Sequence, residues 1–244
     1  MTRLNDLPLR RLQFYVTTQY ACGYLPEQNA RSLTAIPANL IDTQAYSELV
    51  NMGFRRSGNY TYRPHCDHCQ ACVPVRIKVD DFSPSRSQRR AQKQHGNLEV
   101  FMQPLVFNME HFQLYAQYQK LRHTGGGMDN DDSEQYRSFL MQSQIDTVLM
   151  EFREDGVLRM VSVMDKLSDG LSAVYAFYDA TVAGASYGTY NVLWLINFCR
   201  ELGLPHLYLG YWIKQSRKMS YKAEFKPIEG LIGDVWQPLV LDQP

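Results

Sequence analysis

The chain has 244 residues, and its 25 basic and 25 acidic side chains give a net charge of zero. The apolar fraction of 45 % and the aromatic fraction of 12 % predict a folded globular protein and exclude an intrinsically disordered one. Its first residues contain no apolar run of signal-peptide length, and no later stretch is long enough to span a bilayer. Five cysteines without an export signal argue against a disulfide framework, so we expect a cytoplasmic protein with no membrane partner.

The first half of the chain alternates between strand and helix signals. Aromatic and β-branched residues predict a strand at 9–20, and Asp42 is placed to cap a short helix that Gly53 ends. The pair Gly58-Asn59 predicts a turn inside a hairpin at 54–62. Further predicted elements are a half-buried strand at 73–80, a basic helix from 83 to 96 and a strand at 98–107.

The second half of the chain predicts a helix followed by antiparallel strands joined by short turns. Asn108 can cap a helix that runs to about His123, with Phe112, Tyr115, Tyr118 and Leu121 as its apolar side, and a glycine-rich loop at 123–128 follows it. Two Asp-Gly turns separate the predicted strands 147–152, 157–165 and 171–178. A helix that ends at Gly203 and a strand at 207–213 complete the pattern.

Three hairpin-linked strands, a turn, a helix and a further strand match the core order of the GNAT acyltransferase fold. We therefore predict the α+β class: an N-terminal cysteine-containing α/β domain at 1–105 and a GNAT-like acyltransferase domain with a central mixed sheet at 106–244. In that fold, free N–H groups at the helix start meet the phosphate of the acyl carrier. The corresponding residues here are Ser186, Gly188 and Thr189. Fold analogy alone does not establish the function.

Four cysteines are candidates for one metal site. Cys66, Cys69 and Cys72 form two overlapping C-x-x-C steps, a spacing that aims thiolates at one point. Cys22 lies in a Gly/Pro turn and is the candidate fourth ligand. Zinc or an iron–sulfur cluster would suit such a set in a structural role, and the alternative is a loop of reduced, unligated thiols.

Basic residues concentrate in two stretches, 76–93 and 214–226, although the whole chain is neutral. Such patches suggest contact with an anion, for which nucleic acid is a natural candidate, and a merely solvated surface is the alternative.

Several long strings resemble the aminoacyl-tRNA–protein transferases. They are CGYLP at 22–26, RRSGNYTYRP at 55–64, CQACVPVRI at 69–77, SAVYAFYDA at 172–180, the stretch 186–213 and KMSYKAEFKP at 218–227. The length and the cysteine spacing resemble the shorter bacterial leucyltransferases of this family. Eukaryotic relatives carry a second cysteine three residues after the position of Cys22, where this chain has Leu25, so their iron–sulfur chemistry does not transfer directly.

The resemblance implies a cytoplasmic enzyme of the N-end rule pathway. Such an enzyme moves leucine from leucyl-tRNA to proteins that begin with Asp or Glu, which marks them for degradation; DNA is not an expected partner. The ester that joins leucine to its tRNA is already activated, so the transfer step requires no cofactor. The enzyme must orient the α-amine of the acceptor protein, keep this amine neutral, and stabilise the oxyanion that develops on the ester carbonyl.

Candidate site residues follow from this chemistry. Asp179 is the predicted base, with Tyr175 and Tyr178 beside it. A guanidinium suits an acidic acceptor, and we expect Arg76 to provide it, with Arg63 and Arg56 as second choices. Lysine for phosphate and tyrosine for base stacking indicate a tRNA-binding set of Tyr211, Lys218, Tyr221 and Lys222.

The donor pocket favours leucine over arginine. Strands and helix supply Val161, Val163, Val174, Phe177, Leu193 and Trp194, and an arginine pocket would need carboxylates at its end. An arginyl-tRNA donor remains an alternative. Without the resemblance, a GNAT-type enzyme with a thioester donor and a non-enzymatic RNA-binding protein with a zinc knuckle would also be open.

Overall fold

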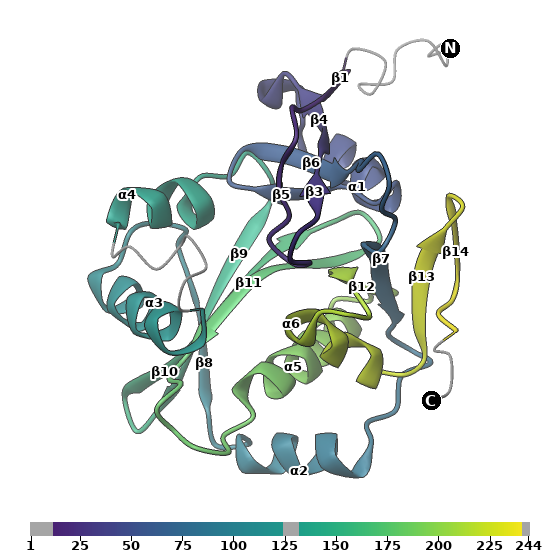
Figure 1. The fold of residues 1–244 in the computed structure, drawn as a ribbon. Helices are drawn as coiled ribbons and strands as arrows, with labels where there is room; N and C mark the ends of the chain where they lie inside the picture. Colours follow the sequence, from purple (N-terminus) through teal and green to yellow (C-terminus); the bar gives the residue numbers. More distant parts are fainter. Residues whose placement is uncertain (1–11, 124–131, 241–244) are drawn as a thin grey trace, which may run out of the picture.

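The computed structural model describes residues 12–123 and 132–240, and a large mixed sheet dominates the described chain (Figure 1). This sheet has eight strands in the order β14-β13-β7-β12-β11-β10-β9-β8. Its strands are β7 (Val73–Lys78), β8 (Glu99–Gln103), β9 (Thr147–Glu154), β10 (Val157–Lys166), β11 (Gly170–Tyr178), β12 (His206–Trp212), β13 (Ile228–Ile232) and β14 (Val235–Pro238). The predicted α+β class with a central mixed sheet is confirmed.

Two smaller sheets lie in the N-terminal part. One has four strands in the order β1-β4-β6-β5 and the other pairs β2 with β3. Their strands are β1 (Gln13–Val16), β2 (Tyr20–Ala21), β3 (Asn29–Ala30), β4 (Ser32–Ile36), β5 (Arg55–Ser57) and β6 (Tyr60–Pro64). The single strand predicted at 9–20 is therefore two short strands, and residues 9–11 lie outside the described chain.

Helices cover both faces of the large sheet. They are α1 (Thr43–Asn51), α2 (Arg86–Gln94), α3 (Met109–Arg122), α4 (Ser133–Tyr136), α5 (Tyr187–Glu201) and α6 (Arg217–Ser220), with short helical turns at Ala38–Leu40, Arg137–Met141 and Tyr221–Glu224. One core cluster joins α2 and α5 to the sheet, a second joins α3 and α4 to its other face, and a third lies beneath α1.

Local sequence signals explain most element ends. The side chain of Asp42 accepts a hydrogen bond from the Ala45 N–H at the start of α1, and Asn108 caps α3 in the same way. Gly53 and Gly203 adopt positive φ just after α1 and α5, and both Asp-Gly turns lie where they were predicted. Leu121, expected on the apolar side of α3, is instead 53 % exposed, although Leu114, seven residues earlier on the same face of the helix, is buried.

The strands of the large sheet come from both halves of the chain. β7 and β8 precede residue 106 and yet pair with β12 and β9 of the second half. The division into 1–105 and 106–244 stays a prediction. The hairpin β13–β14 was not anticipated, and residues 124–128 of the predicted glycine-rich loop lie outside the described chain.

Candidate active site

The large sheet opens between its two parallel neighbours, β11 and β12. Their pairing extends only from Gly170–Ser172 of β11 against His206–Tyr208 of β12. Both strands then bulge at the same level: Val174 is skipped in the register with β10, and Leu209 is skipped in the register with β7. A bulge bends its strand and interrupts the ladder, so two adjacent bulges leave carbonyl groups without strand partners.

Arg55 of β5 fills this opening. Its guanidinium donates to the carbonyl oxygens of Ala173 at 2.7 Å and Val174 at 3.2 Å, and to that of Leu209 at 3.4 Å. Gly210 makes room for it, because a Cβ atom at this position would lie 1.5 Å from Arg55 Nη1. Gly210 also has φ +73°, a conformation that glycine adopts without strain. Arg55 forms no ion pair with any carboxylate in the described ranges.

A cavity of about 1210 Å³ lies between the N-terminal sheets and this opening. Its walls include Gln119 and His123 near the end of α3, Tyr175 of β11, Tyr211 of β12 and Lys218 of α6. Tyr60 and Tyr62 of β6 also contribute, since alternate residues of a strand face the same side. The walls thus come from segments spread over most of the chain.

The four predicted cysteine ligands all line this cavity. Cys22, Cys66, Cys69 and Cys72 are free thiols of intermediate exposure. Burial, together with the other three cysteines, raises the pKa of Cys72 to about 12. Within the described ranges, however, no three Cys, His, Asp or Glu side chains converge as metal ligands. The thiol donor set would suit zinc or an iron–sulfur cluster, and we derive no step through a metal.

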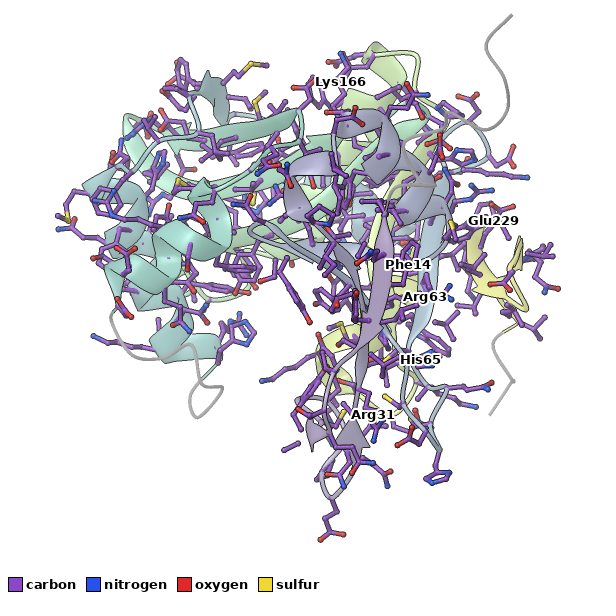
Figure 2. All side chains as sticks on the ribbon, turned by 90° about the horizontal axis from the view of Figure 1, so that it is seen from above. Phe14, Arg31, Arg63, His65, Lys166 and Glu229 are labelled. Carbon is purple, nitrogen blue, oxygen red and sulfur yellow. The ribbon has the colours of Figure 1, made fainter. Side chains whose placement is uncertain are left out.

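Of the three predicted acceptor arginines, two have carboxylate partners of their own. Arg56 forms a buried ion pair with Asp165 at 2.6 Å. Arg76 pairs with Glu229 at 2.8 Å, and its guanidinium lies 4.5 Å from the centre of the Trp236 ring. Arg63 lines the cavity, donates to the carbonyl of Met52 at 3.0 Å and covers the Phe54 ring. Arg63 and Phe14, both labelled in Figure 2, each contact the ring of Phe54.

The predicted catalytic residues separate in space. Tyr175 lines the cavity, and its hydroxyl accepts a hydrogen bond from Gln119 Nε2 at 3.2 Å. Tyr178 instead packs its ring against Tyr118, with centroids 4.8 Å apart.

Asp179 is held away from the cavity walls by an ion pair with Arg159 at 2.9 Å. Burial alone would raise the pKa of Asp179, but hydrogen bonds from Thr181 and Arg159 hold it below its usual value. A carboxylate stabilised in this way is a weaker proton acceptor than a free one.

The predicted donor-binding turn lies at the start of α5. Ser186 adopts a left-handed φ of +54°, and its side chain does not cap the helix. A Cβ atom on Gly188 would make ordinary contact with the Tyr178 ring at 3.6 Å, so this turn adjoins Tyr178. Thr189 lies in the first turn of α5.

The predicted tRNA-binding set divides into surface and interior residues. Lys218 lines the cavity, and Tyr221 is 41 % exposed. Tyr211 is buried and donates to the carbonyl of Gly53 at 2.9 Å. Lys222 is only 4 % exposed and donates to the carbonyl of Tyr211 at 2.6 Å. Burial and the charge of Arg55 hold the pKa of Lys222 well below its usual value, and Lys222 is not among the residues that line the cavity.

Two family models together match most of the chain. Family models described as "Arginine-tRNA-protein transferase, N terminus" and "Arginine-tRNA-protein transferase, C terminus" match residues 20–90 and 110–232. The aspartate/glutamate leucyltransferases of Nitrosospira multiformis and Methylobacillus flagellatus are each 57 % identical over 98 % of this chain and 95–96 % of their own lengths. The chain belongs to the arginine-tRNA-protein transferase family. Members of this family are aminoacyltransferases, as the resemblance implied.

A relative from Pseudomonas aeruginosa, also an aspartate/glutamate leucyltransferase, is 45 % identical over 95 % of the chain. Among solved structures, FemX aligns with a TM-score of 0.44 and 9 % identity over 81 % of this chain and 79 % of its own. A tandem GNAT protein from the clavulanic acid biosynthesis pathway aligns with a TM-score of 0.40 over 87 % of this chain and 58 % of its own.

Sequence reasoning missed several residues of the site. Arg55 adjoins Arg56 in the quoted string RRSGNYTYRP, but nothing local shows which of the two faces a sheet opening. The alternation of Tyr60 and Tyr62 in NYTYR was a usable signal, because it places both rings on one face of β6. His123 also lines the cavity, and burial together with the charges of Lys218 and Arg122 lowers its pKa, which favours the neutral imidazole.

Proposed function

We propose that this protein transfers leucine from leucyl-tRNA to the N-terminal Asp or Glu of acceptor proteins, in the cytoplasm where charged tRNA is made. The observation that carries the proposal is 57 % identity to aspartate/glutamate leucyltransferases over 98 % of the chain. The cavity of about 1210 Å³ also suits two substrates, since it exceeds the roughly 300–1,000 Å³ of a small-ligand pocket.

The reaction is attack of an α-amine on an aminoacyl ester, which forms an amide bond and releases the 3′-hydroxyl of the tRNA. Holding amine and carbonyl at near-attack distance can supply several kcal/mol of the barrier. The amine must lose a proton, and its pKa near 8 requires only a modest base. Asp179 stays the base predicted from the sequence. His123 lines the cavity, and its lowered pKa favours the neutral imidazole, so we propose His123 as the alternative base.

For the acceptor carboxylate we favour Arg63 among the three predicted arginines. It lines the cavity and has no carboxylate partner among the described residues, whereas Asp165 and Glu229 already neutralise Arg56 and Arg76. Arg63→Ala should raise the KM for peptides that begin with Asp or Glu. Arg76→Ala, the direct test of our first choice from the sequence, should then act mainly on stability.

A structural zinc ion or iron–sulfur cluster at the four cysteines remains a separate proposal, supported by their spacing and their common cavity. Elemental analysis of protein purified without oxygen would test it. Metal-free protein that is folded and fully active would contradict it.

The deciding experiment for the activity is a competition. Leucyl-tRNA and arginyl-tRNA, each with a different isotope label, are offered together with one peptide that begins with Asp. We expect leucine to be transferred by preference, because an apolar pocket rejects an unpaired guanidinium. Peptides that begin with Glu and with Ala provide the matched positive and negative acceptors. Comparable transfer of arginine, or equal use of the Ala peptide, would overturn the proposal.

A further inference from the structure

Tyrosine rings line the cavity in a series that runs from solvent to interior. The six residues are Tyr20, Tyr24, Tyr60, Tyr62, Tyr175 and Tyr211. Tyr20 is 47 % exposed, Tyr60 46 % and Tyr24 40 %, whereas Tyr211 at the inner end is 3 % exposed. Large rings half open to solvent are costly to leave uncovered, so this edge of the cavity is built for contact with another molecule.

The exposed rings are held in fixed positions. Tyr60 and Tyr62 share one face of β6, and their rings are nearly parallel, with an interplanar angle of 27° and centroids 5.5 Å apart. The Tyr20 hydroxyl shares a hydrogen bond of 2.6 Å with Ser32 Oγ of β4. Tyr60 therefore stacks on Tyr62 with one side and remains partly open to solvent. A flat partner can extend such a stack without first ordering the side chains.

The charged residues of the same cavity favour an anionic partner. Its walls carry Arg31, Arg63 and Lys218 against Asp234 as the one carboxylate among the described residues, whereas the whole chain has equal numbers of acidic and basic residues. Arg31 also pairs with Asp67 at 3.2 Å, at the outer edge where both side chains are more than one-third exposed. Arg63 and Lys218, which have no carboxylate partner among the described residues, therefore carry the excess of positive charge in the cavity that the exposed rings line.

We propose that Tyr20 and Tyr60 form a stacking platform for the unpaired 3′ nucleotides of charged tRNA. The proposal rests on the proposed function and specifies where that donor enters. Bases of single-stranded RNA stack on aromatic side chains, while nearby cations meet the phosphates. The row of rings then leads inward to Tyr62 and Tyr175, beside the sheet opening, where the aminoacyl ester would be presented. An acidic peptide needs a single cation and does not require two ring faces.

The test measures RNA binding apart from transfer. A tRNA whose terminal adenine is replaced by 2-aminopurine is titrated with the full-length protein, and fluorescence quenching reports stacking. Tyr20→Ala and Tyr60→Ala should each raise the Kd for this RNA about 5- to 150-fold, the range that loss of one base stack implies. Tyr60→Phe should keep most of the affinity, because it retains the ring.

Tyr15→Ala is the matched control. Tyr15 belongs to β1 in the same N-terminal sheet region, is 52 % exposed and lies outside the cavity walls. Its loss should leave both Kd and quenching unchanged. As a second control, a duplex that ends without unpaired nucleotides should compete far less well than intact tRNA.

The outcomes separate this proposal from the proposed function. Unchanged Kd in Tyr20→Ala and Tyr60→Ala, or wild-type protein that does not quench the 2-aminopurine, would overturn the platform even if leucine transfer is confirmed. A raised KM for the acceptor peptide with unchanged RNA affinity would assign the surface to the peptide and also overturn it. Conversely, if the variants lose RNA affinity while the wild-type protein transfers no leucine, the platform stands and the proposed function fails.

Discussion

Arg56, a candidate for binding the acceptor carboxylate, instead forms a buried ion pair with Asp165 that stabilises the fold. Both side chains are almost completely buried, with exposed fractions of 2 % and 0 %. Two guanidinium nitrogens contact the two carboxylate oxygens at 2.7 and 2.6 Å, and Thr147 donates to the same carboxylate at 2.7 Å. A guanidinium that is fully used in this way has little capacity left for an acceptor substrate.

Asp165→Asn should therefore destabilise the protein strongly. It leaves Arg56 charged and buried without a counter-ion, which costs about 3–5 kcal/mol of the free energy of unfolding. Urea denaturation followed by circular dichroism measures the change. The matched control is Glu154→Gln, whose partner Arg159 is 24 % exposed and keeps its second ion pair with Asp179; we expect about 1 kcal/mol or less. Equal effects in both variants would contradict the structural role given to the buried pair.

At the scale of elements, the contact between the hairpin β5–β6 and the separated strands β11 and β12 attaches the N-terminal sheet to the large sheet. Arg55 reaches from the hairpin to three carbonyl groups beyond the last β11–β12 pair, and two of them belong to Val174 and Leu209, the residues that the bulges skip. Arg56, the next residue, faces the opposite side of β5 and enters the core. One short hairpin therefore both anchors the N-terminal sheet and completes a wall of the cavity.

The steric match between Arg55 and Gly210 leads to a prediction about coupling. Gly210→Ala should be strongly destabilising, because its Cβ would overlap the Arg55 guanidinium and φ is +73°. Gly203→Ala is the control: φ is +66°, but no atom lies within 4 Å, so only the backbone strain of about 1–2 kcal/mol remains.

Arg55→Ala alone should cost about 1.5–3 kcal/mol through lost charge-assisted hydrogen bonds. In the Arg55→Ala background, the destabilisation caused by Gly210→Ala should fall to that of the Gly203→Ala control, because the clash with the Arg55 guanidinium is gone. A double-mutant cycle by urea denaturation measures this coupling, and strictly additive effects would show that the two residues do not share the space.

At the scale of the whole molecule, acidic groups held in ion pairs set the response to pH. Burial alone would raise the pKa values of Glu151 and Glu229, but bonds from Arg153 and His111, and from Arg76 and Lys78, lower both. Asp169 behaves likewise, since hydrogen bonds from His206, Tyr208 and Asn51 outweigh its burial. Each of these carboxylates joins elements that are distant in sequence.

The protein should therefore lose stability in acid. The folded pKa values lie below the unfolded ones, so the unfolded state binds more protons, and stability present above about pH 4 to 4.5 is lost as pH falls through the folded values. Thermal unfolding between pH 7 and pH 3 measures this loss. Glu229→Gln should flatten the acid limb, because it removes one of the linked groups. A melting temperature that is constant down to pH 3 would contradict the prediction.

The sequence by itself determined the family and most of the elements, but not the hairpin β13–β14. Caps at Asp42 and Asn108, two Asp-Gly turns and the alternation of apolar residues at 73–79 depend on neighbours a few residues away, so local chemistry suffices to predict them. The four cysteines were grouped from spacing and turn context, and they do line one cavity.

Only the tertiary structure decided which arginines have a carboxylate partner and which do not. Arg76 meets Glu229 across 153 positions and Arg56 meets Asp165 across 109, while Arg55, with no such partner, occupies a gap that two bulges create. A pattern in sequence specifies which face of a strand a side chain takes. It does not specify what lies opposite, because that depends on which strands pair and where their ladders break, and these are long-range properties of the folded chain.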